Sequence, residues 1–166
     1  ARVQGEGAPE ELCDALDHDR PLAPRGARSL PGVAAAIDRH LRSPLDLALA
    51  STATRVRATL DGVLPRISAP REVRWLRGLY LAESESLLAE LNGLPDGVRT
   101  VLLCGHNPGL HQLALELLDD GGTVEALRAG LPTAGLVIVD VDDEWAHIGV
   151  GSGRLVEFRA PLEEAG

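Results

Sequence analysis

Two segments of the sequence place polar side chains at the junction between an apolar run and a predicted helix. In the first, Ser51 follows a buried run, and Arg55 lies about one turn into the helix that comes next. Ser51 is suited to cap this helix, because its hydroxyl can accept a hydrogen bond from the free N–H groups of the first turn. In the second, His106 lies between a buried run and a helix that Asn107 is suited to cap. Because ligands of open α/β sheets bind at the carboxyl ends of the strands, we expect Arg55 and His106 to meet at one crevice.

These junctions point to the binding of a phosphate or a carboxylate. A helix N-terminus already favours anions, and the guanidinium of Arg55 above it makes a stronger anion site. The spacing alone also fits a solvated Arg on a helix surface, and taken by itself it favours that alternative. His106 has few packing reasons to lie between a buried strand and a helix cap. An imidazole there can donate to an oxyanion or move a proton near neutral pH, so we predict a functional role for His106.

Two other chemistries find less support in the sequence. Cys104, His106 and His111 lack the spacing of a zinc site, so we expect no metal and no other cofactor. No G-x-S-x-G segment accompanies Ser51 or Ser84. Its absence argues against a serine hydrolase that uses His106 as its base.

The remaining candidates lie outside the two junctions. Glu83 and Glu85 are predicted to lie at a helix start, where acidic side chains suit the helix dipole. Both are candidate proton donors, and Glu83 could serve only if it turns inward. His18 is predicted to be a solvated loop residue, and His40 and His147 are predicted to lie on the surface.

Apolar periodicity and turn residues predict the elements that must position these side chains. Residues 1–28 are rich in charge, Gly and Pro and are predicted to form mainly a loop. We predict helices over residues 26–42, 52–64, 83–94 and 108–118, and strands over residues 45–50, 98–104, 135–141, 145–150 and 154–159. The alternation of helices and apolar strands indicates an α/β sheet covered on both faces, with antiparallel strands near the C-terminus.

Length and composition limit the function classes. The 166 residues fit one domain over residues 1–166, and 45% apolar with 25% charged residues is typical of a globular protein. The net charge of −9 argues against a nucleic-acid binder or a protein of anionic membrane surfaces. No apolar run reaches the roughly 18 residues of a membrane span. No signal peptide is visible and the two Cys residues make no disulfide framework, so we expect a cytoplasmic protein.

Six segments together resemble one protein family. They cover residues 19–26, 51–59, 79–82, 105–110, 131–135 and 153–158. Each segment is unspecific alone, but their order and spacing make almost the whole chain similar to the histidine phosphatase superfamily (phosphoglycerate mutase-like), in its SixA-type branch of phosphohistidine phosphatases. The resemblance implies a three-layer α/β/α fold with a mostly parallel central sheet and antiparallel strands near the C-terminus.

The phosphate pocket of this family uses two Arg and two His side chains. By resemblance, Arg55 matches the second Arg, His106 matches the second His, and Arg20 matches a loop Arg beside the pocket. The first Arg and the nucleophilic His come from an Arg-His pair that ends a central first strand, and no residues of this chain match that pair. We expect the strand and its pair upstream of Ala1, because a sheet without its central strand leaves two rows of backbone groups unpaired.

The resemblance implies a phosphatase that acts through a phosphohistidine intermediate. The expected substrate is a phosphorylated protein, in particular protein phosphohistidine, or a small phosphorylated molecule. The acidic residue of the mutase-like branches has no clear match near Glu83, and this favours an N–P substrate, whose leaving group needs no strong acid. Three alternatives remain: a small-molecule phosphomonoesterase on the same fold, a non-catalytic phosphate-binding or regulatory relative, and an α/β domain without a phosphate site.

Overall fold

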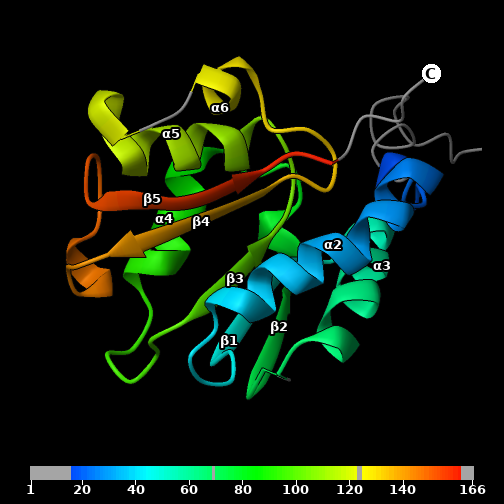
Figure 1. Ribbon diagram of the computed structural model, residues 1–166, viewed down its shortest axis with the longest axis horizontal. Helices are drawn as coiled ribbons and strands as arrows, with labels where there is room; N and C mark the ends of the chain where they lie inside the picture. The colour runs from blue at the N-terminus through cyan, green and yellow to red at the C-terminus, as the bar shows by residue number, and fades with distance from the viewer. Residues whose placement is uncertain (1–15, 69, 123–124, 162–166) are drawn as a thin grey trace, which may run out of the picture.

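A three-stranded parallel sheet in the order β2-β1-β3 organises the fold, and an antiparallel pair, β4-β5, forms a second sheet (Figure 1). The computed structural model describes residues 16–68, 70–122 and 125–161. Its strands are β1 (Leu47–Ser51), β2 (Glu72–Leu76), β3 (Val101–Cys104), β4 (Leu136–Val141) and β5 (Gly153–Arg159). Its helices are α2 (Pro24–His40), α3 (Thr54–Val63), α4 (Ser84–Asn92), α5 (Gly109–Gly122) and α6 (Glu125–Ala129). None of the helices in these described ranges is long and apolar enough to cross a membrane.

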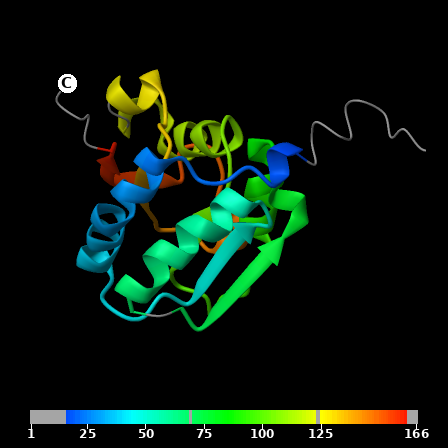
Figure 2. The same ribbon diagram turned by 90° about the vertical axis from the view of Figure 1, so that its right-hand side faces the viewer.

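Strand β1 separates two apolar layers, because successive side chains of a strand point to opposite faces. Ala48 and Ala50 pack with residues of α2 and α3, whereas Leu47 and Leu49 pack with residues of α4 and α5. All five residues of β1 are buried. The two ribbon views show α2 and α3 next to each other on one side of the sheet (Figures 1 and 2). The sheet is therefore covered on both faces, and the predicted α/β class with antiparallel strands near the C-terminus is confirmed.

The two sheets are not joined by strand pairing within the described residues. Strand β3 pairs with β1 along one edge, and β4 pairs with β5 along one edge, so each has a second edge without a strand partner in this part of the chain. A cavity of about 560 Å³ touches both sheets. It is lined by β3, by Leu136 at the start of β4, and by apolar side chains of α2 and α3.

Most predicted elements are present with shifted ends. Helix α2 begins at Pro24 rather than residue 26, because Pro has the backbone angle of the first helical turn and needs no N–H there. The loop predicted over residues 1–28 is therefore wrong for residues 24–28, and residues 16–18 also form a helical turn. The rest of that prediction, residues 1–15, lies outside the described residues.

The strand predicted over residues 145–150 is wrong. Trp145–His147 form a short 3-10 turn instead. The side-chain amide of Asn92 donates to the carbonyl of Trp145 at 2.7 Å and to the carbonyl of Ile148 at 3.0 Å. Trp145 Nε1 donates to the carbonyl of Val98 at 2.6 Å. The amide of Asn92 thus occupies two carbonyl groups that a strand would use for hydrogen bonds to a neighbouring strand. Trp145 and Ile148 instead pack into the apolar core.

Two short elements, β2 and α6, are absent from the sequence-based predictions. Strand β2 alternates charged residues with Val73 and Trp75, and it lies at the edge of the sheet. Its charged residues interrupt the continuous apolar run from which the buried strands were predicted, so the sequence did not indicate this strand. The guanidinium of Arg57, on α3, lies 4.2 Å from the centre of the Trp75 ring and covers this face of the strand.

Candidate active site

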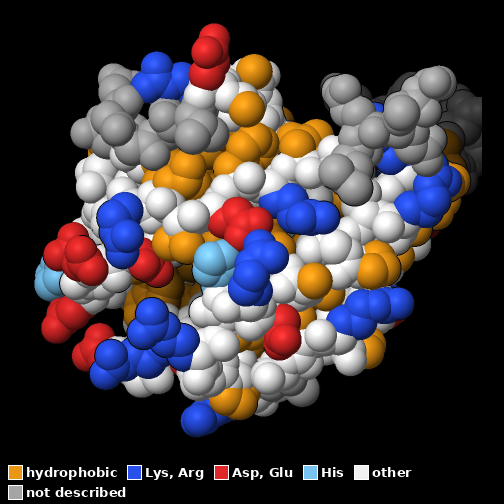
Figure 3. Space-filling view, viewed as in Figure 1, with side chains coloured by type: hydrophobic (Ala, Val, Ile, Leu, Met, Phe, Trp, Pro, Cys, Tyr) orange, Lys and Arg blue, Asp and Glu red, His pale blue; other side chains and the backbone are white. Residues whose placement is uncertain are grey.

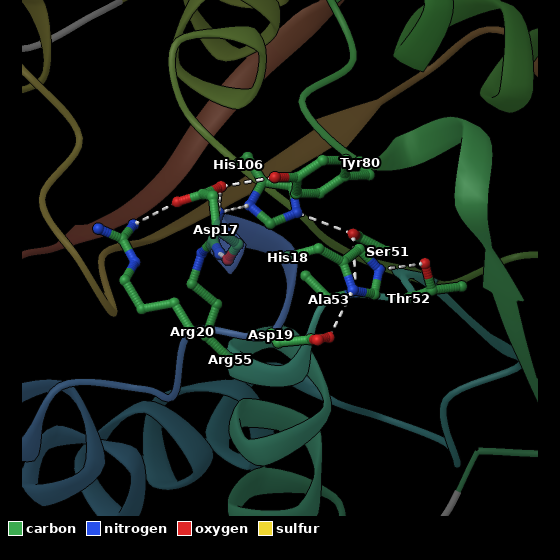
Figure 4. Close-up of polar contacts among 10 residues, drawn as sticks. All are labelled: Asp17, His18, Asp19, Arg20, Ser51, Thr52, Ala53, Arg55, Tyr80 and His106. Carbon is green, nitrogen blue, oxygen red and sulfur yellow. Dashed lines mark hydrogen bonds and ion pairs between the residues drawn. The ribbon is translucent and has the colours of Figure 1, made fainter. Parts of the chain in front are cut away.

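The register of the parallel sheet brings the two polar junctions together. Strands β1 and β3 are neighbours, and Ala50 pairs with Cys104 at their carboxyl ends. Arg55 lies in the first turn of α3, which follows β1, and His106 lies in the turn that follows β3. Arg55 Nη2 is 3.1 Å from His106 Nδ1, so the prediction that these two residues meet at one crevice is confirmed (Figure 4).

Neither helix is capped as predicted. The N-cap residue of α3 is Ala53, and Ser51 ends the strand instead. The Ser51 hydroxyl oxygen accepts a hydrogen bond from the Ala53 N–H at 3.3 Å. Helix α5 begins at Gly109, and the side-chain amide of Asn107 donates to the carbonyl of Leu131. Neither predicted capping side chain therefore occupies the N-cap position of its helix.

Gly109 joins the turn that carries His106 to the loop after Tyr80. Its Cα lies so close to the carbonyl oxygen of Ala82 that an added Cβ would collide with that oxygen. A backbone carbonyl cannot move away as a flexible side chain can, so the position requires glycine. The two loops are therefore in direct backbone contact at the edge of the crevice.

His106 is the buried partner of the pair. Only 7% of its surface is exposed, and its Nε2 lies 2.8 Å from the Ser51 hydroxyl oxygen. Burial removes the imidazole from water, and the guanidinium of Arg55 adds a repelling positive charge. These two effects, burial first, lower the pKa of His106 to about 4. His106 is therefore neutral near pH 7, and Arg55 carries the fixed positive charge beside it.

Arg55 is held by the loop that precedes α2. Its Nη1 donates to the backbone carbonyl of Asp17 at 2.7 Å, and its Nη2 donates to Asp17 Oδ2 at 3.2 Å. The side chain is 16% exposed. Asp17 on one side and His106 on the other thus fix the guanidinium in one orientation (Figure 4).

Asp17 is a central residue of the crevice that the sequence did not indicate. Its Oδ2 also accepts a hydrogen bond from the Tyr80 hydroxyl at 2.6 Å, and its Oδ1 lies 3.3 Å from Arg20 Nη2. The Tyr80 hydrogen bond, with the positive charges of Arg55 and Arg20, lowers the pKa of Asp17 below its usual range. Asp17 is therefore an ionised carboxylate that balances the charge of the two Arg residues.

Tyr80 and His18 form one wall of the crevice. The Tyr80 ring lies edge-on to the rings of both His106 and His18, with centroid distances of 5.3 Å and 5.0 Å. His18 Nε2 lies 2.9 Å from the Thr52 hydroxyl. The prediction of a solvated loop residue at position 18 is therefore wrong, because Tyr80 and Thr52 partly bury the imidazole.

The other predicted site residues lie farther out. Arg20 is exposed and lines the cavity close to Arg55. Glu83 and Glu85 lie at the N-terminus of α4, as predicted. Both are exposed, and neither is among the residues that line the cavity.

Two residues on the cavity wall have left-handed backbone conformations. They are Leu81, with φ of 50°, and Ala134, with φ of 58°. They are the non-glycine residues with positive φ within the described ranges. Such conformations cost energy for residues with a Cβ and concentrate at functional sites. Both strained non-glycine backbone conformations of the described residues thus lie at the cavity.

No three His, Cys, Asp or Glu side chains of residues 16–68, 70–122 and 125–161 form a group that could hold a metal ion. Burial raises the pKa of the Cys104 thiol to about 12, so it carries no thiolate near neutral pH. His111 donates from Nε2 to the carbonyl of Leu127 and does not join His106.

Comparison with known sequences finds close relatives among mycobacterial proteins. An uncharacterised protein of Mycobacterium tuberculosis is 38% identical over 149 residues, which are 87% of this chain and 91% of the relative. An uncharacterised protein of Mycobacterium leprae is 34% identical over 158 residues, 93% of each chain. No protein-family model matches the chain.

Comparison with solved structures finds SixA proteins. A protein of Nakamurella multipartita assigned as the phosphohistidine phosphatase SixA has a TM-score of 0.76 and 29% identity, covering 89% of this chain and 88% of that one. One from Agrobacterium tumefaciens with the same assignment has a TM-score of 0.69 and 29% identity, covering 95% and 92%. A protein histidine phosphatase SixA complexed with tungstate has a TM-score of 0.69, covering 87% and 86%. Because its sequence identity is 24%, this last structure shows a shared fold alone.

Proposed function

This chain belongs to the histidine phosphatase superfamily and has its SixA-type fold, and from this premise we propose that it is a phosphatase acting through a phosphohistidine intermediate. The observation that carries the proposal is the contact between Arg55 and His106 at the carboxyl ends of β1 and β3. The proposed substrate is phosphohistidine on a protein.

Arg55 and His106 bind the phosphoryl group. Phosphoryl transfer needs mainly positioning and stabilisation of the charge on the equatorial oxygens. Arg55 supplies a permanent charge, and Asp17 and His106 hold it in place before substrate arrives. Arg20, exposed at the cavity, adds a second positive charge that draws in the phosphorylated group.

The nucleophile of the proposed reaction is the His of an Arg-His pair on a strand expected upstream of Ala1. Two features of the fold support this placement. Within the described residues, β3 and β4 each have an edge without a strand partner. The cavity that touches both strands is lined by Leu102, Leu103 and Leu136, the kind of lining that a buried strand requires.

The proposed reaction has two transfers. In the first, the nucleophilic imidazole nitrogen bonds to phosphorus while the N–P bond of the substrate breaks; the attacking ring gives up a proton to solvent, and the leaving imidazole takes one up. In the second, water attacks phosphorus while the N–P bond to the enzyme breaks; one proton of the water goes to the enzyme imidazole, and inorganic phosphate leaves. This covalent route divides one difficult step into two easier ones.

The absence of a suitable acid in the described cavity supports an N–P substrate. Glu83 and Glu85 are exposed outside the cavity lining. Asp17 lies inside it, but the hydrogen bond from Tyr80 keeps its pKa low, so it holds no proton to give near pH 7. A phosphoester would need such a proton on its leaving oxygen, whereas the imidazole of phosphohistidine leaves more easily.

The test uses the full product of the gene. It is mixed with a histidine-phosphorylated protein and, separately, with aryl and sugar phosphates, and released phosphate is measured. We expect turnover of the phosphohistidine protein, an acid-labile phosphoryl group trapped on the enzyme, and loss of both in His106→Ala. Turnover of the phosphoesters alone would assign a small-molecule phosphomonoesterase. Phosphate binding with no turnover, or a gene without an upstream Arg-His pair, would reject the enzyme.

A further inference from the structure

Ser51 has a polar side chain in a position where the fold otherwise places apolar ones. It is the last residue of β1 and is 0% exposed. Its hydroxyl oxygen accepts a hydrogen bond from the backbone N–H of Ala53 at 3.3 Å, and Nε2 of His106 lies 2.8 Å from it. A buried hydroxyl is retained where it satisfies a neighbouring polar group, so its partners indicate its role.

The partner of the other ring nitrogen determines where the proton of His106 lies. A guanidinium has five N–H donors and no acceptor. Arg55 Nη2, 3.1 Å from His106 Nδ1, therefore donates, and Nδ1 must offer its lone pair. In a neutral imidazole the proton is then on Nε2, and the Nε2–H group donates to the Ser51 oxygen.

We propose that Ser51 is a positioning residue that accepts a hydrogen bond from Nε2–H of His106 and so holds the ring with Nδ1 facing Arg55 and the bound phosphoryl group. The part of this inference that concerns the phosphoryl group rests on the proposed function. Ser51 is not among the residues that line the cavity, and its hydrogen bond to His106, which is, is the contact through which it acts.

The surroundings of His106 leave this task to Ser51. Tyr80 contacts the imidazole with the edge of one ring to the other, which restricts the ring but does not distinguish its two nitrogens. Asp17, the nearest carboxylate, bonds to Tyr80 and Arg55. Within the described residues, the Ser51 oxygen is the acceptor that Nε2–H reaches.

The test reads the protonation of the ring nitrogens directly. Protein labelled with 15N is studied by NMR near pH 7, with spectra that connect each ring nitrogen of His106 to the ring C–H protons. Three variants are compared with the unmodified protein. Ser51→Ala removes the acceptor, and Ser51→Cys keeps nearly the same shape with a sulfur that accepts hydrogen bonds only weakly. Ser84→Ala is the matched control, since Ser84 is also buried but bonds to Glu116, away from the crevice.

We expect the unmodified protein and Ser84→Ala to carry the proton on Nε2. Because Arg55 still faces Nδ1, both Ser51 variants should keep the proton on Nε2, but the Nε2 signal should shift because its N–H group has lost its acceptor. Inorganic phosphate, titrated into the same samples, should bind about tenfold more weakly to the Ser51 variants, as expected for the loss of one buried hydrogen bond.

A proton on Nδ1 in the unmodified protein would overturn the inference without any variant. An unchanged Nε2 signal, or unchanged phosphate affinity, in Ser51→Cys would also overturn it, because this variant preserves the packing. If Ser51→Ala does not fold, Ser51→Cys carries the comparison. The NMR measurement needs no turnover, so a protein that hydrolyses nothing would refute the proposed function and leave this inference intact.

Discussion

Among the described residues, two clusters combine Arg, His and a carboxylate, and they differ in what faces the imidazole. In the crevice, Arg55 lies against His106, and Asp17 contacts Arg55 but not His106. On the outer surface, Glu157 of β5 lies between Arg39 and His40 at the end of α2, accepting hydrogen bonds at 2.8 Å and 2.6 Å. Figure 3 shows acidic, basic and His side chains beside one another on one face of the molecule.

The comparison teaches that residue types do not define a site. Arg39-His40 is itself an Arg-His pair in sequence, yet both side chains lie at the surface, and Glu157 accepts a hydrogen bond from each. Within the described residues, His106 is buried and hydrogen-bonds to Arg55 and Ser51 rather than to a carboxylate, and both His106 and Arg55 line the cavity. We therefore expect large functional effects from changes in the crevice and small effects from matching changes at the surface.

The largest contrast is expected between the two Arg residues. Arg55→Ala should lower kcat/KM for the phosphohistidine substrate by roughly 100-fold or more, the range for removing a preorganised charge stabiliser. Arg39→Ala should leave kcat/KM within about twofold, because it removes a solvent-exposed ion pair. Steady-state kinetics on the full gene product measures both values. Equal effects of the two changes would contradict the distinction between the clusters.

The second contrast concerns pH and the free energy of unfolding. His106 has a pKa of about 4 in the folded protein, against an ordinary value near 6.5. Between these two pH values the unfolded chain binds more protons than the folded one, so the free energy of unfolding should fall as the pH drops from about 6.5 to about 4. Below about pH 4, His106 is protonated in both states and should cause no further loss. The loss from His106 is at most on the order of 3 kcal/mol.

Urea unfolding at several pH values tests this expectation, with His106→Gln as the comparison. The variant should lack this slope between about pH 6.5 and 4. Carboxylates with lowered pKa values lose their contribution at lower pH, and these are Asp17, Asp46, Glu72 and Glu157. The same slope in protein and variant would mean that His106 is not the group responsible.

A smaller effect is expected from Tyr80→Phe. The variant removes the hydrogen bond from the Tyr80 hydroxyl to Asp17 Oδ2, which should raise the pKa of Asp17 toward its usual range. We expect a loss of about 1 kcal/mol in the free energy of unfolding, as for one partly buried hydrogen bond. NMR titration of the Asp17 carboxyl and urea unfolding measure the two quantities, and an unmoved Asp17 pKa would reject the assigned cause.

The smallest effect is expected at the surface carboxylate. Glu157→Gln should change the free energy of unfolding by less than about 1 kcal/mol and leave turnover unchanged, since two exposed partners gain little from an ion pair. Thermal unfolding at low and high salt measures this. A loss of activity would show that the surface cluster communicates with the crevice.

The sequence predicted the framework of the crevice better than its contents. The meeting of Arg55 and His106 followed from two junctions at the same edge of a parallel sheet, and their contact confirms it. Asp17 and Tyr80 lie in segments without apolar periodicity, so no pattern indicated that the chain folds them onto Arg55. The strand predicted at residues 145–150 does not form, because the side-chain amide of Asn92, distant in sequence, hydrogen-bonds to two carbonyl groups of this segment. Long-range side-chain bonds of this kind leave no local signal.

The close approach of Gly109 to Ala82 has a consequence for how the protein can diversify. Every other amino acid at position 109 would push the turn of His106 away from the loop after Tyr80. Mutations that remodel either loop must therefore preserve this backbone contact, so a change in the position of one loop requires a matching change in the other. Changes in substrate preference are consequently easier to acquire elsewhere in the cavity lining, for example at Arg20, which belongs to neither loop.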